Sequence, residues 1–198
     1  MNGATAEDWR ALLSRLNSSV LGSDDLKENL TEGMVSTGWC GLPPATSRDI
    51  AAAEGRLGAS LPPSYRAFLS VSNGWPLFDT FIERLLPVEE VDWLRAADPD
   101  GLSLIQGYGD HDISDQDYLD YERHSEAIRT SYYPQCLLIG KAWEPEGEMV
   151  LLNSDIVSRD GEWEAIFFAD WLPGNQRYRS FYDLVNGRLR VFESFGQG

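Results

Sequence analysis

Apolar positions near the start of the chain recur with the period of an α-helix. They fall on a single stripe made by Trp9, Leu12, Leu13, Leu16 and Val20. Thr5, followed three residues later by Asp8, resembles a capping box, which stabilises the first turn of a helix. The pattern therefore predicts a helix from Thr5 to about Gly22. The polar residues 23–36 predict a connector or a short extra helix.

Two shorter helices are predicted next, joined by a tight corner. The first begins at Thr46, ends at Gly58, and has an apolar face made by Ile50, Ala53 and Leu57. Pro62 and Pro63 suit the first turn of the second helix, where a missing N–H costs nothing. Its buried face consists of Tyr65, Phe68, Leu69 and Ser72. The dipeptide Asn73-Gly74 predicts a left-handed stop after it.

The pattern changes from Leu77 onward, where apolar runs become short. We predict a β-like stretch over 77–86, a brief helix opening at Pro87, turns over 98–112, and a helix from Ser114 to about Arg129.

Three strands and one helix are predicted in the remainder of the chain. The strands are Cys136–Gly140, Met149–Asn153 and Trp163–Ala169, and the third alternates as a half-buried strand does. Asp160-Gly161 predicts a type I′ hairpin turn, in which both residues have positive φ. A last helix begins at Ser180. Helices followed by antiparallel strands predict one α+β domain.

Composition and charge narrow the function classes. A net charge of −16 repels phosphate backbones and anionic lipid, so we expect no nucleic-acid or membrane binding and instead a basic protein partner. No basic region leads into an apolar stretch at the N-terminus, and no run approaches ~18 apolar residues. Cys136 lies in an apolar run, where a reduced thiol is favoured over a disulfide with Cys40. We expect a soluble cytoplasmic protein.

Catalytic and cofactor motifs are absent from the sequence. It contains no GxxxxGK[ST] phosphate loop, GxSxG elbow, HExxH or CxxC, and only two histidines. We therefore expect no enzyme, no cofactor and no metal site. The one alternative is the run from Asp110 to Asp117, where carboxylates at alternate positions could hold a hard cation or catalyse hydrolysis. An EF-hand loop would need Gly and Glu where Asp115 and Tyr121 stand, so a solvated acidic loop is the simpler interpretation.

Partner binding is the remaining candidate function. Trp39 and Trp75 flank glycines, where an exposed ring could anchor a partner, although packing over the adjoining corner is the commoner outcome. The candidate partner-binding residues are Trp39, Trp75, Asp110, Asp112, Asp115, Asp117, Glu144, Glu146 and Glu148.

The segment from Gly58 to Trp75, GASLPPSYRAFLSVSNGW, resembles the signature of the SUKH superfamily, which includes bacterial immunity proteins and a fungal cell-wall assembly regulator. The resemblance implies a helix-flanked, mixed and mostly antiparallel sheet over residues 37–192, preceded by an N-terminal helix and connector (1–36) and followed by a tail (193–198). It implies that the signature residues are scaffold, namely Leu61, Pro62, Tyr65, Phe68, Leu69, Asn73 and Gly74. It also implies an immunity protein that neutralises a polymorphic toxin, often a nuclease.

The negative charge is concentrated in the middle of the chain. Residues 79–170 hold 22 acids and six bases, whereas the two flanking segments nearly balance. We expect an acidic face there, complementary to a basic toxin. Two alternatives stay open: an intracellular regulatory or scaffold module of the same fold, and a cation-binding protein or enzyme using the Asp110–Asp117 run.

Overall fold

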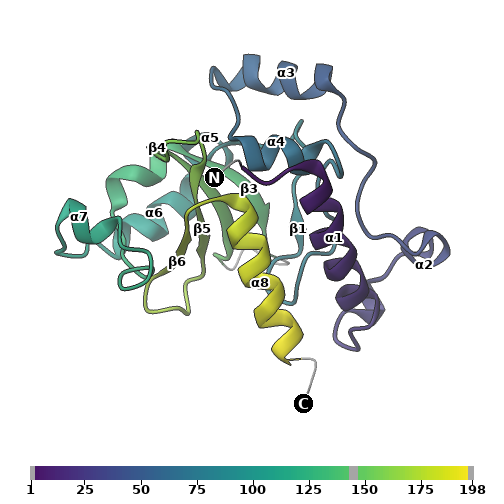
Figure 1. Ribbon diagram of the computed structural model, residues 1–198. Helices are drawn as coiled ribbons and strands as arrows, with labels where there is room; N and C mark the ends of the chain where they lie inside the picture. Colours follow the sequence, from purple (N-terminus) through teal and green to yellow (C-terminus); the bar gives the residue numbers. More distant parts are fainter. Residues whose placement is uncertain (1–2, 143–146, 196–198) are drawn as a thin grey trace.

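The computed structural model describes residues 3–142 and 147–195, and it has the expected α+β architecture (Figure 1). The α-helices are α1 (Ala6–Leu21), α2 (Glu32–Thr37), α3 (Ser47–Leu57), α4 (Pro63–Leu69), α5 (Leu94–Ala97), α6 (Pro99–Gly107), α7 (Asp115–Tyr118) and α8 (Phe181–Phe195). The short 3-10 helices are η1 (Lys27–Asn29) and η2 (Thr130–Gln135). The strands are β1 (Arg84–Leu85), β2 (Asp92–Trp93), β3 (Cys136–Lys141), β4 (Met149–Val157), β5 (Trp163–Phe168) and β6 (Asn175–Tyr178).

One six-stranded sheet organises the fold. Its order is β1-β3-β4-β5-β6, and β2 pairs with β3 beside β1. Within the described parts of the chain every strand pair is antiparallel. The three predicted strands form its centre, with Leu138 opposite Leu151 and Leu151 opposite Ile166. The long central strands are buried because helices cover both faces of the sheet.

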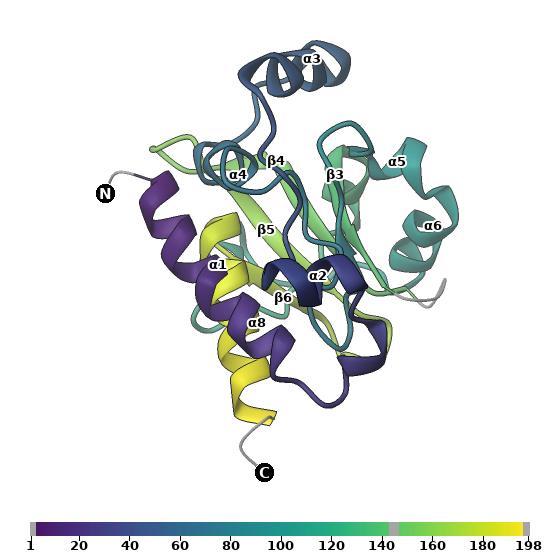
Figure 2. The same cartoon turned by 90° about the vertical axis from the view of Figure 1, so that its right-hand side faces the viewer.

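The helices form two layers around this sheet. Figure 2 shows α1 and α8 on one side of the strands and α5 and α6 on the other. Trp9 of α1 lies in an aromatic cluster with Phe68 of α4 and Phe181 of α8, at ring-centroid distances of 5.2 and 5.3 Å. The N-terminal helix therefore shares its hydrophobic core with the rest of the molecule. Thr5 and Asp8 form the predicted capping box at its start.

The segment after α4 connects the helical pair to the sheet. Leu61, Tyr65, Phe68 and Leu69 are buried, as is Pro62. The Asn73 side-chain oxygen accepts a hydrogen bond from Val88 N at 2.9 Å, and Gly74 has φ 97°. A Cβ on Gly74 would lie 2.8 Å from the carbonyl oxygen of Leu85, so only glycine fits. These residues hold α4 against the start of the sheet.

Two helix predictions after Pro87 are wrong because tertiary contacts capture the backbone. Arg56 donates to the carbonyl oxygens of Val88 and Val91, so a turn forms there and α5 begins only at Leu94. The helix expected over 114–129 is limited to the four residues of α7, and the rest is held in turns by contacts described below.

A helix, α6, occupies part of the stretch that we predict to be turns. Asp98 caps it by accepting from Gly101 N at 2.9 Å, Pro99 lies at its first position, and Ile105 is fully buried. Pro99 and Gly101 sit in the first turn, where helices tolerate them, so they were misleading as turn signals.

Two details of the β4–β5 hairpin also differ from the sequence prediction. Only Gly161 has positive φ, at 82°, so the turn is not type I′. Gly161 N instead donates to Ser158 O, a three-residue arrangement with glycine in the left-handed position. Strand β5 is buried on both faces rather than on one. Strand β6 was not predicted, because its four residues include only one apolar side chain.

Cys40 and Cys136 are free and buried, and burial raises the pKa of both thiols. Among the described residues, no helix combines the length and the apolar character needed to cross a membrane.

Candidate functional site

Acidic side chains are densest on and around α6 and α7. Residues 98–126, here called the acidic segment, contain nine Asp and Glu and a single Arg. Seven of these acids are exposed and none is buried. In Figure 1 the two helices lie together at the side of the molecule away from α1 and α8. The acidic segment therefore presents a concentrated negative charge to solvent.

Three of the four candidate aspartates of this segment have separate structural contacts. Asp110 accepts from Thr130 N and Oγ1 at 2.6 and 2.7 Å, and these hydrogen bonds lower the pKa of Asp110. Asp115 pairs with Arg129 at 2.6 Å, and Asp117 caps α7 together with Ser114. These contacts fix the loop while the carboxylates remain exposed, and Asp112 is exposed beside them.

The geometry does not support the cation alternative for this run. Over residues 3–142 and 147–195, no three His, Cys, Asp or Glu side chains are grouped so that they could hold a metal ion. Three of the four carboxylates instead accept hydrogen bonds from side chains of the protein, namely Arg129, Thr130 and Ser114.

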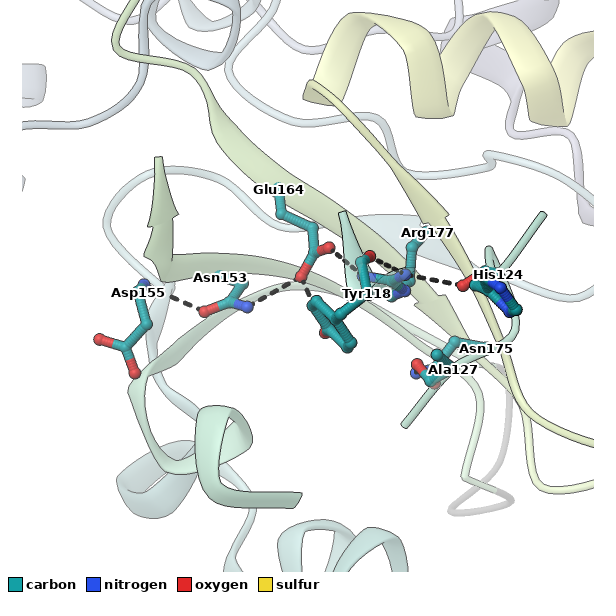
Figure 3. A network of polar contacts seen from close by, with 8 residues as sticks. All are labelled: Tyr118, His124, Ala127, Asn153, Asp155, Glu164, Asn175 and Arg177. Carbon is teal, nitrogen blue, oxygen red and sulfur yellow. Dashed lines mark hydrogen bonds and ion pairs between the residues drawn. The ribbon is translucent and has the colours of Figure 1, made fainter. Parts of the chain in front are cut away.

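A buried arginine attaches the acidic segment to the sheet (Figure 3). Arg177 of β6 donates to Glu164 of β5 at 2.7 Å, and both side chains are fully buried. Its other terminal nitrogen donates to the carbonyl oxygens of Tyr118 and His124, at 2.6 and 2.7 Å. One guanidinium thus binds the sheet and both ends of the turn after α7.

Neighbouring groups complete this network. Asn153 of β4 donates to the second oxygen of Glu164 at 2.8 Å, and the Tyr118 hydroxyl approaches the same oxygen at 3.3 Å. The Arg177 guanidinium carbon lies 3.6 Å from the centre of the Tyr118 ring and 5.1 Å from that of Tyr121. Burial, with the nearby Glu164 carboxylate, raises the pKa of both tyrosines, so their hydroxyls stay protonated. The arrangement suits a rigid support rather than acid–base chemistry.

The two tryptophan candidates differ in exposure. Trp75 is fully buried, so the prediction of an exposed anchor is wrong at this position. Its backbone forms an antiparallel bridge with Leu85 of β1. Trp39 is partly exposed and packs edge-on against Trp75, with ring centres 5.0 Å apart. The structure thus favours packing over the corner for this pair.

Only one of the three glutamate candidates, Glu148, is among the described residues. Glu144 and Glu146 are outside the described residues. Glu148 is partly exposed, and its Oε1 accepts from Trp171 Nε1 at 2.7 Å. Glu148 thus lies beside an exposed aromatic ring that sequence reasoning did not select.

Sequence reasoning also missed the Arg177–Glu164 pair. Alternation along 163–168 marks Glu164 as a polar position and gives no sign that it is buried. The sequence around Arg177 gives no signal either, because Asn175–Tyr178 holds a single apolar side chain. Pairing the two requires the register of β5 with β6.

A family comparison decides the relationship of this chain to known proteins. The model of the SMI1 / KNR4 family (SUKH-1) matches residues 44–196. The chain belongs to the SUKH-1 family. A comparison with curated proteins gives no match. The SUKH-1 match runs from just before α3 to the end of α8, and so includes the Gly58–Trp75 signature, the whole sheet and the acidic segment.

Proposed function

We propose that this SUKH-1 chain is a non-enzymatic cytoplasmic binding protein that neutralises a toxin with a basic surface, as an immunity protein does. The observation that carries the proposal is the acidic segment, which holds nine acids and one Arg in and around α6 and α7, with seven of the acids exposed. A nuclease toxin must present Lys and Arg to phosphates, and an acidic inhibitor can occupy that surface in place of nucleic acid.

Most acids of the middle of the chain face solvent. Of the 20 described acids within residues 79–170, only Asp79, Glu162 and Glu164 are buried. Two of these are neutralised by Arg188 and Arg177, which belong to the C-terminal segment. Both arginines are buried, so they add no positive charge to the surface. The outer surface contributed by 79–170 stays strongly negative.

The buried network supports the proposal in a second way. Arg177 fixes the backbone at Tyr118 and His124, and Asn175 N and Arg177 N bind the carbonyl oxygens of Glu126 and Ser125 at 3.0 Å. A loop that is already ordered loses less conformational entropy when it binds. The acids are thus presented on a preorganised surface.

Co-expression with the product of the adjacent gene tests this function. We expect rescue of growth and a co-purifying complex. A charge variant with four exposed acids of the acidic segment changed to amides should weaken both, namely Asp100→Asn, Asp112→Asn, Glu122→Gln and Glu126→Gln. The matched control removes four exposed acids elsewhere, by Asp24→Asn, Asp25→Asn, Glu28→Gln and Glu32→Gln.

The outcomes separate the alternatives. Equal loss of binding in both charge variants would mean that net charge, and not this surface, is responsible. Absence of both rescue and complex would overturn the immunity role. A complex without rescue would instead favour a regulatory or scaffold module of the same fold.

A further inference from the structure

Exposed apolar side chains gather at one place on this molecule. Among the described residues six large hydrophobic side chains are well exposed, and three of them are Leu104, Tyr108 and Trp171. Trp171 is 51 % exposed. Leu104 lies on α6 and Tyr108 directly follows that helix, whereas Trp171 lies in the connection between β5 and β6. Segments distant in sequence therefore contribute to one surface.

Direct contacts show that this surface is continuous. The Tyr108 hydroxyl donates to the carbonyl oxygen of Asp170 at 2.7 Å. A Cβ placed on Gly147 would lie 3.1 Å from Leu104 Cδ2 and 3.4 Å from Asp170 Cβ. The Trp171 ring packs on Phe81, with centres 5.1 Å apart. The name Trp171 patch is used below for Phe81, Leu104, Tyr108, Glu148, Asp170 and Trp171.

The two carboxylates give this patch its chemistry. Glu148 Oε1 accepts from Trp171 Nε1 at 2.7 Å, which orients the indole ring, and Asp170 is exposed next to it in sequence. Tryptophan is the aromatic side chain that attracts cations best, and arginine combines stacking on a ring with hydrogen bonds to carboxylates. An exposed indole beside two acids is therefore suited to an arginine side chain.

The protein uses the same combination twice in its interior. Arg177 pairs with Glu164 while stacking on Tyr118 at 3.6 Å. Arg188 pairs with Asp79 at 2.7 Å while stacking on Phe167 at 3.9 Å. In both cases an aromatic ring and a carboxylate satisfy one guanidinium. The Trp171 patch offers these two groups on the surface.

We propose that the Trp171 patch is the anchor point for an arginine on the basic face of the partner protein. This inference rests on the proposed function and names the contact through which it acts. The acidic segment includes α6, which carries Leu104 and is followed directly by Tyr108, so long-range attraction leads to the same side of the molecule. A half-exposed tryptophan is the kind of residue that dominates binding energy once attraction has brought two proteins together.

The first test needs no natural partner. The full chain, labelled with ¹⁵N, is titrated with an octa-arginine peptide, and the Trp171 indole signal is identified by its loss in Trp171→Phe. We expect the Trp171 signal to shift and to reach saturation as peptide is added. Trp171→Ala and Glu148→Gln should each weaken the binding of the peptide at least fivefold. Leu119→Ala removes an equally exposed apolar side chain elsewhere and should change the affinity less than twofold. An unmoved Trp171 signal, or equal affinity in Trp171→Ala, would overturn the proposal.

The second test uses the complex with the product of the adjacent gene. Trp171→Ala should raise Kd at least tenfold, Trp171→Phe should retain most of the affinity, and Leu119→Ala should match the wild type. Thermal unfolding of each variant checks that the fold is intact. If the wild type binds and Trp171→Ala binds equally, the anchor is wrong while the proposed function stands. If the wild type does not bind, the proposed function fails, and the peptide titration still decides whether the patch receives arginine.

Discussion

At the scale of single residues, two arginines from the C-terminal part of the chain are buried against carboxylates from its middle. Arg177 meets Glu164, and Arg188 meets Asp79, each at 2.7 Å. A buried ion pair contributes little net stability against an apolar replacement of the same shape, but loss of one partner leaves an unpaired buried charge. Each pair therefore acts mainly to fix which segments lie together.

Removal of the Arg177 charge is expected to be severe. Arg177→Met should lower the free energy of unfolding by about 3–5 kcal/mol, because Glu164 would be left buried without its cation. Arg179→Met, two residues away and exposed, should change it by about 0.5 kcal/mol or less. Urea unfolding measures both. A loss under about 1 kcal/mol in Arg177→Met would contradict the role given to the pair.

Glu162 should make the free energy of unfolding fall as pH rises, whereas an acid whose pKa is lowered by folding has the opposite effect. Burial raises the pKa of Glu162, although Ser64 N and Oγ donate to its carboxylate. A raised pKa in the folded state means that folding takes up a proton. The contribution of Glu162 to stability is therefore present at low pH and is lost as pH rises. The stability of the wild type relative to Glu162→Gln should therefore fall between about pH 4 and pH 7.

A capping aspartate supplies the control for this measurement. Hydrogen bonds from Thr46 lower the pKa of Asp49, so its contribution should be lost as pH falls, and Asp49→Asn should show the reverse trend. Urea unfolding at several pH values compares the two. The same trend in both variants would show that the assigned causes are wrong.

At the scale of elements, the corner after α4 determines how the helical pair meets the sheet. Gly58 and Gly74 both have positive φ, 68° and 97°, and lie at the two ends of the signature. The space around them differs. A Cβ on Gly58 would meet nothing within 4 Å, whereas one on Gly74 would meet backbone atoms of Leu85, Leu86 and Pro87. A side chain at Gly58 would therefore meet only the strain of positive φ, whereas one at Gly74 would also clash with backbone atoms.

Alanine substitutions at these glycines should differ in cost. Gly58→Ala bears only the left-handed penalty, about 1–2 kcal/mol. Gly74→Ala adds a clash with backbone that cannot move freely, so we expect about 3 kcal/mol or more. Thermal or urea unfolding of both variants measures the difference. Equal costs would mean that the close approach at Gly74 relaxes easily.

At the scale of the whole molecule, the sheet separates an aromatic helical layer from the layer that carries the acidic segment. Trp9, Phe68 and Phe181 join α1, α4 and α8 on one face. On the other, α6 packs near η2 and the acidic segment presents its acids to solvent, while Arg177 holds the turns after α7 to β6. One layer supplies core, and the other is available for binding.

The charge of this outer layer predicts a salt-dependent association with the product of the adjacent gene. The association rate should fall by on the order of tenfold or more between about 0.01 and 0.15 M ionic strength, because screening shortens the reach of the attraction. The dissociation rate should change much less. Stopped-flow mixing measures both rates, and the variant lacking four acids of the acidic segment should show a flatter dependence than its matched control. A flat dependence in the wild type would contradict electrostatic steering.

Much of the fold follows from local pattern. Capping pairs and apolar stripes predict α1 and α3 to within a residue, whereas α4 ends at Leu69, before the expected Ser72. Apolar runs predict β3 and the first part of β4, which continues past Asn153 to Val157, and alternation predicts β5. The predictions failed at α6, α7 and β6, where apolar signals are short or absent. In the region after α7, long-range bonds from Arg177 outweigh the helical tendency that the local sequence suggests.

The candidate site was only partly accessible from sequence. The excess of acids over 79–170 is a property of composition, and it located the acidic segment. The sequence does not show that Trp75 is buried and Trp171 exposed. Both tryptophans lie next to glycine and proline, and they differ only in what packs on them.

The sequence by itself determined the α+β class, the resemblance to the SUKH superfamily and the location of the negative charge along the chain. These depend on neighbours within a few residues or on simple counts. Only the tertiary structure decided which acids form ion pairs with buried arginines, which acids remain exposed to solvent, and which tryptophan is exposed beside Glu148 and Asp170. Those outcomes depend on contacts between residues far apart in sequence, such as Asp79 with Arg188, which no local pattern encodes.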